Sequence, residues 1–407
     1  MKIKNVEAFL MSYLMPDKIE LPFWGGVRTI VKRDAMLIKI TADNDLKGYA
    51  PGPAFTRALE EINTIIKEFL IGKDPSQWKQ FKFSGNAETI KTYYAAEVAL
   101  LDLVGKYEQC SISELMGGRV RSSIKLYGSA GMYMSPEKYA EEASAIQQMG
   151  FPAYKMRPAA GPEGDLKTLD LMRQATGPNM GLMVDAHTWW RMGDKNYSSE
   201  LISELTASMS AFNPYWLEEP LPPEDHHAYK KLKQQGIIRI ATGEHEQNFE
   251  GFEDLAILQA TDFLQMDVCC QGGFEMGLRV FDLAAAHKMK FAFHSWGTML
   301  EVLAAAQLGV CREESVVEWL EYPCYSSADN VGMYPFPLSH EILKEELEIE
   351  KGYLKLPSGY GLGIDINEEV IKKYPFIPGA WSFFYQDTPK KTIAVTGDHS
   401  IKWEEKI

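Results

Sequence analysis

Acidic side chains follow three successive short apolar runs of this sequence, at Asp185, Glu218 and Glu244. If these runs are neighbouring strands, the three carboxylates converge and repel one another unless a cation neutralises them. Carboxylate oxygens with open positions left for water and substrate suit Mg²⁺. The pattern therefore predicts one Mg²⁺ ion held by Asp185, Glu218 and Glu244. A single acidic residue at such a position often does no more than cap the following helix.

Two histidines accompany these acids. Asp267 and His294 end two further successive runs, where the carboxylate would orient the imidazole and raise its basicity. His187 follows Asp185 by two positions and shares its face in an extended chain. A lone histidine is more often structural, but two beside a metal site favour catalysis. We therefore predict proton transfer by His187 and by the His294–Asp267 pair.

Other polar residues are placed to contact a substrate. Lys155 and Arg157 put two cations on one face, where they balance the carboxylates or bind an anionic substrate and stabilise its negative charge. Lys155 is predicted to be catalytic, since a lysine can also act as a base if its pKa falls, which an arginine effectively cannot. Glu321 ends the last apolar run. The stretch LPFWGGVRT contains Trp24 and Arg28 beside two glycines, and it either covers the site and contacts the far end of the substrate or is an ordinary surface turn.

The pattern of the sequence between Ser123 and Tyr322 predicts the strands and helices that position these residues. Eight apolar runs alternate there with helical patterns, which indicates parallel strands joined by crossovers. Eight such units predict an α/β fold, a (β/α) barrel of the modified TIM type, whose strand ends share one mouth. The catalytic barrel is predicted over residues 123–330. The runs are IKLYGSA, AYKMRP, GLMVDAH, YWLEEPL, IRIATGEHE, FLQMDVCC, KFAFHSW and VVEWLEY.

The chain outside the barrel reads differently. Alternation in KIKNVEAFL and DAMLIKITAD predicts antiparallel strands, and helical periodicity follows in AETIKTYYAAEVALLDLVGKYEQ. Residues 1–122 are therefore predicted to form an α+β capping domain. The proline- and aromatic-rich segment 331–407 either completes that domain or forms an independent tail.

Composition excludes several classes of protein. The 407 residues carry 42 basic and 56 acidic side chains, a net charge of −14 without a basic cluster, which argues against nucleic-acid or anionic-membrane partners. Five scattered cysteines suggest neither a disulfide framework nor a zinc site. With no run long enough to span a membrane and no clear signal peptide, the cytoplasm is the expected location.

Seven motifs, in the order in which they occur, resemble those of the enolase superfamily and its mandelate racemase subgroup. They are YKMRP, VDAH, WLEEP, TGEHE, QMDV, FHSW and WLEY. The resemblance runs from about residue 1 to about residue 330. It implies that Asp185, Glu218 and Glu244 are the Mg²⁺ ligands and that Asp267 and His294 are a catalytic pair. It also implies a small acid substrate whose carboxylate is hydrogen-bonded by Glu321, and a symmetric homo-oligomer.

One departure from the family pattern narrows the expected reaction. Lys155 matches the first lysine of the family's Lys-x-Lys motif, but the second, often the catalytic base, is Arg157. The Asp-x-His at Asp185 and His187 is similar to that of galactonate and mannonate dehydratases. The TGEHE stretch, in contrast, is more similar to the corresponding stretch of rhamnonate dehydratase. This resemblance implies dehydration of an aldonate or aldarate to a 2-keto-3-deoxy acid. The alternatives are a racemase, epimerase or cycloisomerase acting at the α-carbon, and a catalytically silent binding protein.

Overall fold

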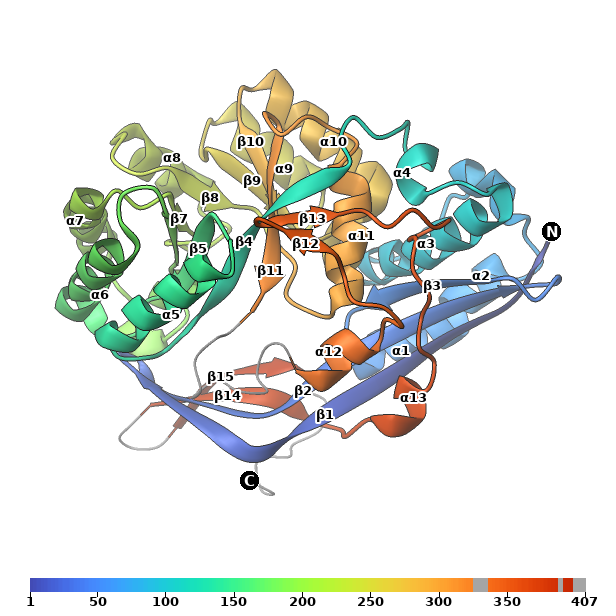
Figure 1. The fold of residues 1–407 in the computed structure, drawn as a ribbon, viewed down its shortest axis with the longest axis horizontal. Helices are drawn as coiled ribbons and strands as arrows, with labels where there is room; N and C mark the ends of the chain where they lie inside the picture. The colour runs from blue at the N-terminus through green and yellow to red at the C-terminus, as the bar shows by residue number, and fades with distance from the viewer. Residues whose placement is uncertain (325–335, 387–390, 398–407) are drawn as a thin grey trace.

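Eight parallel strands form a closed barrel in the computed structural model, which describes residues 1–324, 336–386 and 391–397. The barrel closes where β11 pairs with β4, with Leu320 opposite Leu126. This arrangement confirms the predicted fold class (Figure 1). The strands are β4 (Ser123–Met132), β5 (Ala153–Arg157), β6 (Gly181–Asp185), β7 (Trp216–Glu218), β8 (Ile240–Thr242), β9 (Phe263–Met266), β10 (Lys290–Phe293) and β11 (Val317–Pro323).

Helices connect consecutive barrel strands, and several of them begin at polar capping residues. Ser135, Ser198 and Asp225, for example, each accept a hydrogen bond from a backbone N–H in the first turn of their helix. The connecting helices are α5 (Pro136–Gln148), α6 (Gly161–Thr176), α7 (Ser199–Met209), α8 (His226–Gln234), α9 (Phe249–Ile257), α10 (Gly273–Ala286) and α11 (Met299–Gly309).

The barrel interior explains why its mouth is polar. A buried layer of large side chains and alanines fills the lower part of the barrel, and it consists of Tyr127, Ala153, Met183, Trp216, Ala241, Phe263, Ala292 and Trp319. Side chains two positions further along a strand point the same way. The layer above is therefore Ser129, Lys155, Asp185, Glu218, Gly243, Gln265, His294 and Glu321. Almost every inward-facing position of that second layer is polar or charged.

An antiparallel sheet and several helices precede the barrel, as predicted. The long strands β1 (Ile3–Phe23) and β2 (Gly26–Ala42) pair from Ile3 opposite Ala42 to Phe23 opposite Gly26, and β3 (Lys47–Gly52) adds to β2. The long helix α3 (Ala87–Glu108) packs against β3. The shorter helices are α1 (Thr56–Glu61), η1 (Ile62–Ile66), α2 (Lys67–Leu70), η2 (Pro75–Gln80) and α4 (Ile112–Leu115).

The C-terminal segment contacts both sheets. Its strand β14 (Ala380–Gln386) pairs with β2 and with β15 (Lys391–Gly397), whereas β12 (Ile349–Glu350) and β13 (Tyr353–Lys355) extend the barrel sheet at β4. Two short helices, α12 (Pro337–Glu341) and α13 (Val370–Lys373), lie between these strands. The pairing of β14 with β2 supports the prediction that this segment completes the cap. The predicted boundary at residues 330 and 331 lies outside the described residues.

The LPFWGGVRT stretch is a tight hairpin turn. Phe23 and Gly26 are paired across it, and Gly26 has φ +145°. A Cβ atom on Gly26 would lie 1.9 Å from the carbonyl oxygen of Tyr385, so glycine is required where β14 passes. The backbone N–H of Trp24 donates to Ala159 O at 2.8 Å, which joins the tip of the cap to the loop after β5. No helix among the described residues is long and apolar enough to cross a membrane.

Candidate active site

A cavity of about 120 Å³ lies at the mouth of the barrel. Six of the predicted site residues line it, and they come from the capping sheet as well as from four barrel strands or the loops that follow them. The C-terminal strands add three further side chains. The lining residues are Arg28, Met132, Arg157, Asp185, His187, Arg191, Glu244, His294, Trp296, Trp381, Phe384 and Thr396.

His187 and Asp185 form the first histidine–carboxylate pair. Nδ1 of His187 lies 2.7 Å from Oδ1 of Asp185. Burial opposes ionisation of Asp185, but the charges of His187, Lys155 and Arg157 outweigh it and hold the pKa of this carboxyl well below its usual value. Burial lowers the pKa of His187, although Asp185 opposes that shift.

His294 forms the second pair, with Asp267. Nδ1 of His294 lies 3.4 Å from Oδ2 of Asp267, and Nε2 lies 3.4 Å from Oε2 of Glu244. Burial would lower the pKa of His294, but the charges of Glu244, Glu321 and Asp267 raise it well above the usual value. Asp267 is fixed in turn by the backbone N–H groups of Cys269 and Cys270, each at 2.8 Å.

Lys155 is fully buried behind the cavity wall, among carboxylates. Its Nζ atom lies 2.7 Å from Glu218, 2.9 Å from Glu321 and 3.6 Å from Asp185. Burial and the charges of Asp185, Glu244 and Glu321 raise the pKa of Glu218 to about 8 although Lys155 opposes this shift. Glu321 is also buried, but Lys155, His294 and Arg157 lower its pKa to about 2. Burial would lower the pKa of Lys155, but the charges of Glu218 and Glu321 raise it well above its usual value.

Arg157 lies on the wall of the cavity in a fixed orientation. One guanidinium nitrogen donates to Ala130 O at 2.9 Å, Nε lies 3.4 Å from Oδ2 of Asp185, and the guanidinium carbon lies 4.1 Å from the centre of the Trp296 ring. These contacts place a permanent positive charge beside the Asp185–His187 pair.

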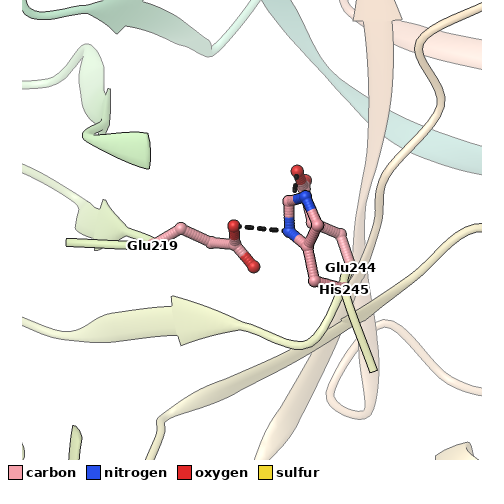
Figure 2. A group of neighbouring side chains, drawn as sticks. All are labelled: Glu219, Glu244 and His245. Atoms are coloured by element: carbon pink, nitrogen blue, oxygen red, sulfur yellow. Dashed lines mark ion pairs between the residues drawn. The ribbon is translucent and has the colours of Figure 1, made fainter. Parts of the chain in front are cut away.

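Glu219, Glu244 and His245 form a third group beside the mouth. Nδ1 of His245 lies 2.7 Å from Oε2 of Glu219 and 3.6 Å from Oε1 of Glu244, and Figure 2 shows the imidazole between the two carboxylates. Burial would lower the pKa of His245, but the charge of Glu219 and its hydrogen bond raise it to about 9. Glu219 adopts a left-handed backbone conformation with φ 43°, which turns it out of the strand. The imidazole of His245 does not line the main cavity.

The two predicted cap residues differ in their position. Arg28 lines the cavity, where Nε donates to Oγ of Ser382 at 2.9 Å and the guanidinium carbon lies 4.8 Å from the centre of the Phe384 ring. Trp24 packs on Tyr197, with ring centres 4.4 Å apart, and does not line the cavity as the structure describes it.

Family models match most of the chain. Residues 138–370 match the model described as enolase C-terminal domain-like. Residues 9–117 match the model of the mandelate racemase / muconate lactonizing enzyme N-terminal domain. The chain belongs to the enolase superfamily, in the mandelate racemase and muconate lactonizing enzyme subgroup.

Relatives within this superfamily cover nearly the whole chain at low identity. A D-galactarolactone cycloisomerase from Agrobacterium fabrum is 28% identical over 92% of this chain and 99% of its own length. A D-gluconate dehydratase from Thermoproteus tenax is 23% identical over 84% of this chain and 69% of its own. The crystal structure of a 3,6-anhydro-D-galactonate cycloisomerase from Zobellia galactanivorans is 28% identical with a TM-score of 0.75, covering 92% of this chain and 99% of its own.

Members of this subgroup generally use a divalent metal ion, and the donor types at this mouth fit one. Several buried carboxylates lie together, and the raised pKa of Glu218 reflects first its burial and then the charges of Asp185, Glu244 and Glu321, which a bound cation would offset. Among the described residues, the ligand atoms of Glu219, Glu244 and His245 lie within 4.8 Å of one another. The predicted ligands Asp185, Glu218 and Glu244 do not form such a group, because Lys155 and Nε1 of Trp216 hold the carboxylate of Glu218.

Sequence reasoning missed several residues of this superfamily site. Three lining residues come from the C-terminal strands, where no sequence pattern indicates a contact with the barrel. They are Trp381, Phe384 and Thr396. Arg191 follows His187 by four residues, and its position in that polar loop was the available signal. Glu219 was overlooked because only the first glutamate of LEEP was expected to face the mouth.

Proposed function

We propose that this protein is a Mg²⁺-dependent dehydratase of a sugar acid. The reaction removes the proton α to the carboxylate and expels the 3-hydroxyl as water, and the resulting enol becomes a 2-keto-3-deoxy acid. The observation that carries this proposal is that two histidines, each with its own carboxylate, line a single cavity: His187 with Asp185, and His294 with Asp267.

Proton transfer is the part of the reaction that these side chains would perform. One imidazole accepts the α-proton, and the other donates a proton to the departing oxygen. Proton exchange with solvent then restores the starting protonation state of both histidines. Asp185 and Asp267 fix the orientation of the rings at Nδ1, and Nε2 of His294 lies 3.4 Å from Glu244. Which histidine is the base follows from the stereochemistry of the substrate.

Negative charge develops on the substrate carboxylate when the α-proton leaves. A Mg²⁺ ion held by Asp185, Glu218 and Glu244 would stabilise that charge. The guanidinium of Arg157, which contacts Trp296 and Ala130, would stabilise the negative charge of the same substrate carboxylate. Lys155 holds Glu218 and Glu321 in place, and Glu321 in turn accepts the backbone N–H of Ser295 at 2.9 Å, next to His294.

The test is to incubate the protein and Mg²⁺ with a panel of aldonic and aldaric acids in D₂O. The proposal expects 2-keto acid formation from at least one acid, with deuterium at carbon 3 of the product. Deuterium in recovered substrate without any keto acid would indicate a racemase or epimerase instead. A metal-loaded protein that does neither with any acid would contradict an enzymatic role at this carbon.

Ring opening is a second candidate function, favoured by two relatives. Both cycloisomerases are 28% identical to this chain and match it over 92% of its length. If the oxygen on carbon 3 belongs to a ring, the same elimination breaks the carbon–oxygen bond without releasing water, and the product is an isomer. Adding D-galactaro-lactone and 3,6-anhydro-galactonate to the panel separates the two functions, since a cycloisomerase would consume these and leave the open-chain acids unchanged.

A further inference from the structure

Arg191 contributes a third guanidinium to the cavity, after those of Arg28 and Arg157, and it lies half-buried on the loop that carries His187. Within the described ranges, no ion pair of 4.0 Å or less joins it to an acidic side chain. Its nearest recorded side-chain partner is the ring of Trp190, 5.6 Å from the guanidinium carbon to the ring centre. Its positive charge is therefore not compensated by the described part of the protein.

The two carboxylates that line the cavity already have cationic partners of their own. Asp185 lies near Lys155, Arg157 and His187, at 3.6, 3.4 and 2.7 Å. Glu244 lies 3.4 Å from His294 and 3.6 Å from His245. A bound divalent cation would add further positive charge. Neither carboxylate that lines the cavity is thus left without a cationic partner for Arg191 to supply.

The loop presents Arg191 from a fixed backbone. Trp189 is fully buried, and its carbonyl accepts the N–H of Tyr197 at 2.8 Å. Nε1 of Trp190 donates to Glu219 O at 3.0 Å, and the N–H of Met192 donates to Oδ1 of Asn196 at 2.6 Å. The fixed backbone of this loop reduces the entropy lost when Arg191 binds an anion.

We propose that Arg191 binds a second carboxylate at the far end of the substrate, so that the preferred substrate is a sugar diacid, an aldarate. This inference rests on the proposed function and specifies its substrate class. A guanidinium matches a carboxylate with two parallel hydrogen bonds, a geometry that the terminal CH₂OH of an aldonate does not offer. Arg191 also borders a second cavity of about 410 Å³, which leaves room beside it for that end of the substrate.

The test compares acids that differ at the far end alone: galactarate with galactonate, glucarate with gluconate, and mannarate with mannonate, with 6-phosphogluconate as an anion of another kind. The proteins are wild type, Arg191→Gln, Arg191→Lys and the control Lys195→Gln, which removes a cation of the same loop that does not line the cavity. Binding is measured by calorimetry on metal-free protein, and kcat and KM are measured with Mg²⁺.

In wild type and in Lys195→Gln, the best diacid should bind at least about tenfold more tightly than its monoacid. Arg191→Gln should abolish this preference, raise KM for the diacid about 10- to 100-fold and leave the monoacid nearly unchanged. Arg191→Lys should recover part of the preference. A monoacid or 6-phosphogluconate as the tightest ligand, or equal losses for both acids in Arg191→Gln, would overturn the inference. If diacid binding depends on Arg191 but no acid reacts, the inference stands and the proposed function fails.

Discussion

Asp185 and Glu218 are register partners at the ends of β6 and β7, and a single ammonium group lies between their carboxylates. Nζ of Lys155 is 2.7 Å from Glu218 and 3.6 Å from Asp185, and none of the three side chains is more than slightly exposed. Two buried acids and one buried cation form a unit in which each charge depends on the others.

Lys155→Met should therefore destabilise the fold. Removing the cation leaves Glu218, Glu321 and Asp185 buried with less compensation, and the loss of one partner of a buried ion pair costs about 3–5 kcal/mol. Urea denaturation at pH 7 measures this cost. The control is Lys290→Met, whose partly exposed ammonium lies 2.6 Å from Glu318 and should contribute at most about 1 kcal/mol. Equal losses in the two variants would contradict this account of Lys155.

Mg²⁺ should raise the thermal midpoint of the protein, because an ion that binds the folded state stabilises it. Asp185→Asn, Glu218→Gln and Glu244→Gln should each weaken Mg²⁺ binding by at least about tenfold, which is about 1.4 kcal/mol. Glu219→Gln is the matched control and should retain binding within about threefold. The opposite result for Glu218 and Glu219 would assign the ion to the Glu219, Glu244 and His245 group.

His187→Asn and His294→Asn should each lower kcat by about 10²- to 10⁴-fold, the usual contribution of a positioned acid or base. Both variants should still show the thermal shift with Mg²⁺, which separates loss of proton transfer from loss of the ion. His227→Asn, an exposed change on α8, should leave kcat unchanged. Full activity in either cavity variant would remove that histidine from the proposed mechanism.

Stability should fall as the pH rises from about 4.5 to about 8, partly because of Glu97 on α3. Burial and the charge of Glu275 raise the pKa of Glu97 from 4.5 to about 8. Below pH 4.5 this carboxyl is protonated in both states and has no effect. Above it, the unfolded state loses the proton first and gains stability, by up to about 1.4 kcal/mol per pH unit, until the folded state also ionises near pH 8.

Glu97→Gln removes this dependence. The variant should match wild type near pH 4.5 and exceed its free energy of unfolding by a few kcal/mol at pH 8, as measured by urea denaturation at both values. Glu60→Gln, at an exposed position of α1, is the control and should follow wild type at each pH. A variant no more stable than wild type at pH 8 would contradict the assignment.

The barrel could be predicted because each of its strands is short, apolar and followed by a helical pattern. The polar mouth could be predicted for the same reason: the inward positions Trp216 and Trp319 are followed two residues later by Glu218 and Glu321, which must face the same way. Local periodicity is sufficient for both conclusions. The roles assigned to the individual site residues remain predictions.

Contacts between segments far apart in the sequence could not be predicted from local periodicity. Nothing in the residues around Trp381 specifies that they pair with β2, because an antiparallel edge accepts many sequences. The orientation of Glu219 depends on a left-handed backbone angle, which non-glycine residues seldom adopt and which a strand pattern does not reveal. Trp24 was expected at the substrate, but it packs on Tyr197, a partner chosen by tertiary contact.

The hydrogen bond from Arg28 to Ser382 joins positions near opposite ends of the polypeptide. During synthesis, both cavity histidines leave the ribosome well before β14 does. A nascent chain could therefore complete its barrel and still lack one wall of the substrate chamber. Premature termination just before β14 would spare the proton-transferring residues and remove Trp381 and Phe384, so the lesion would first affect the choice of substrate.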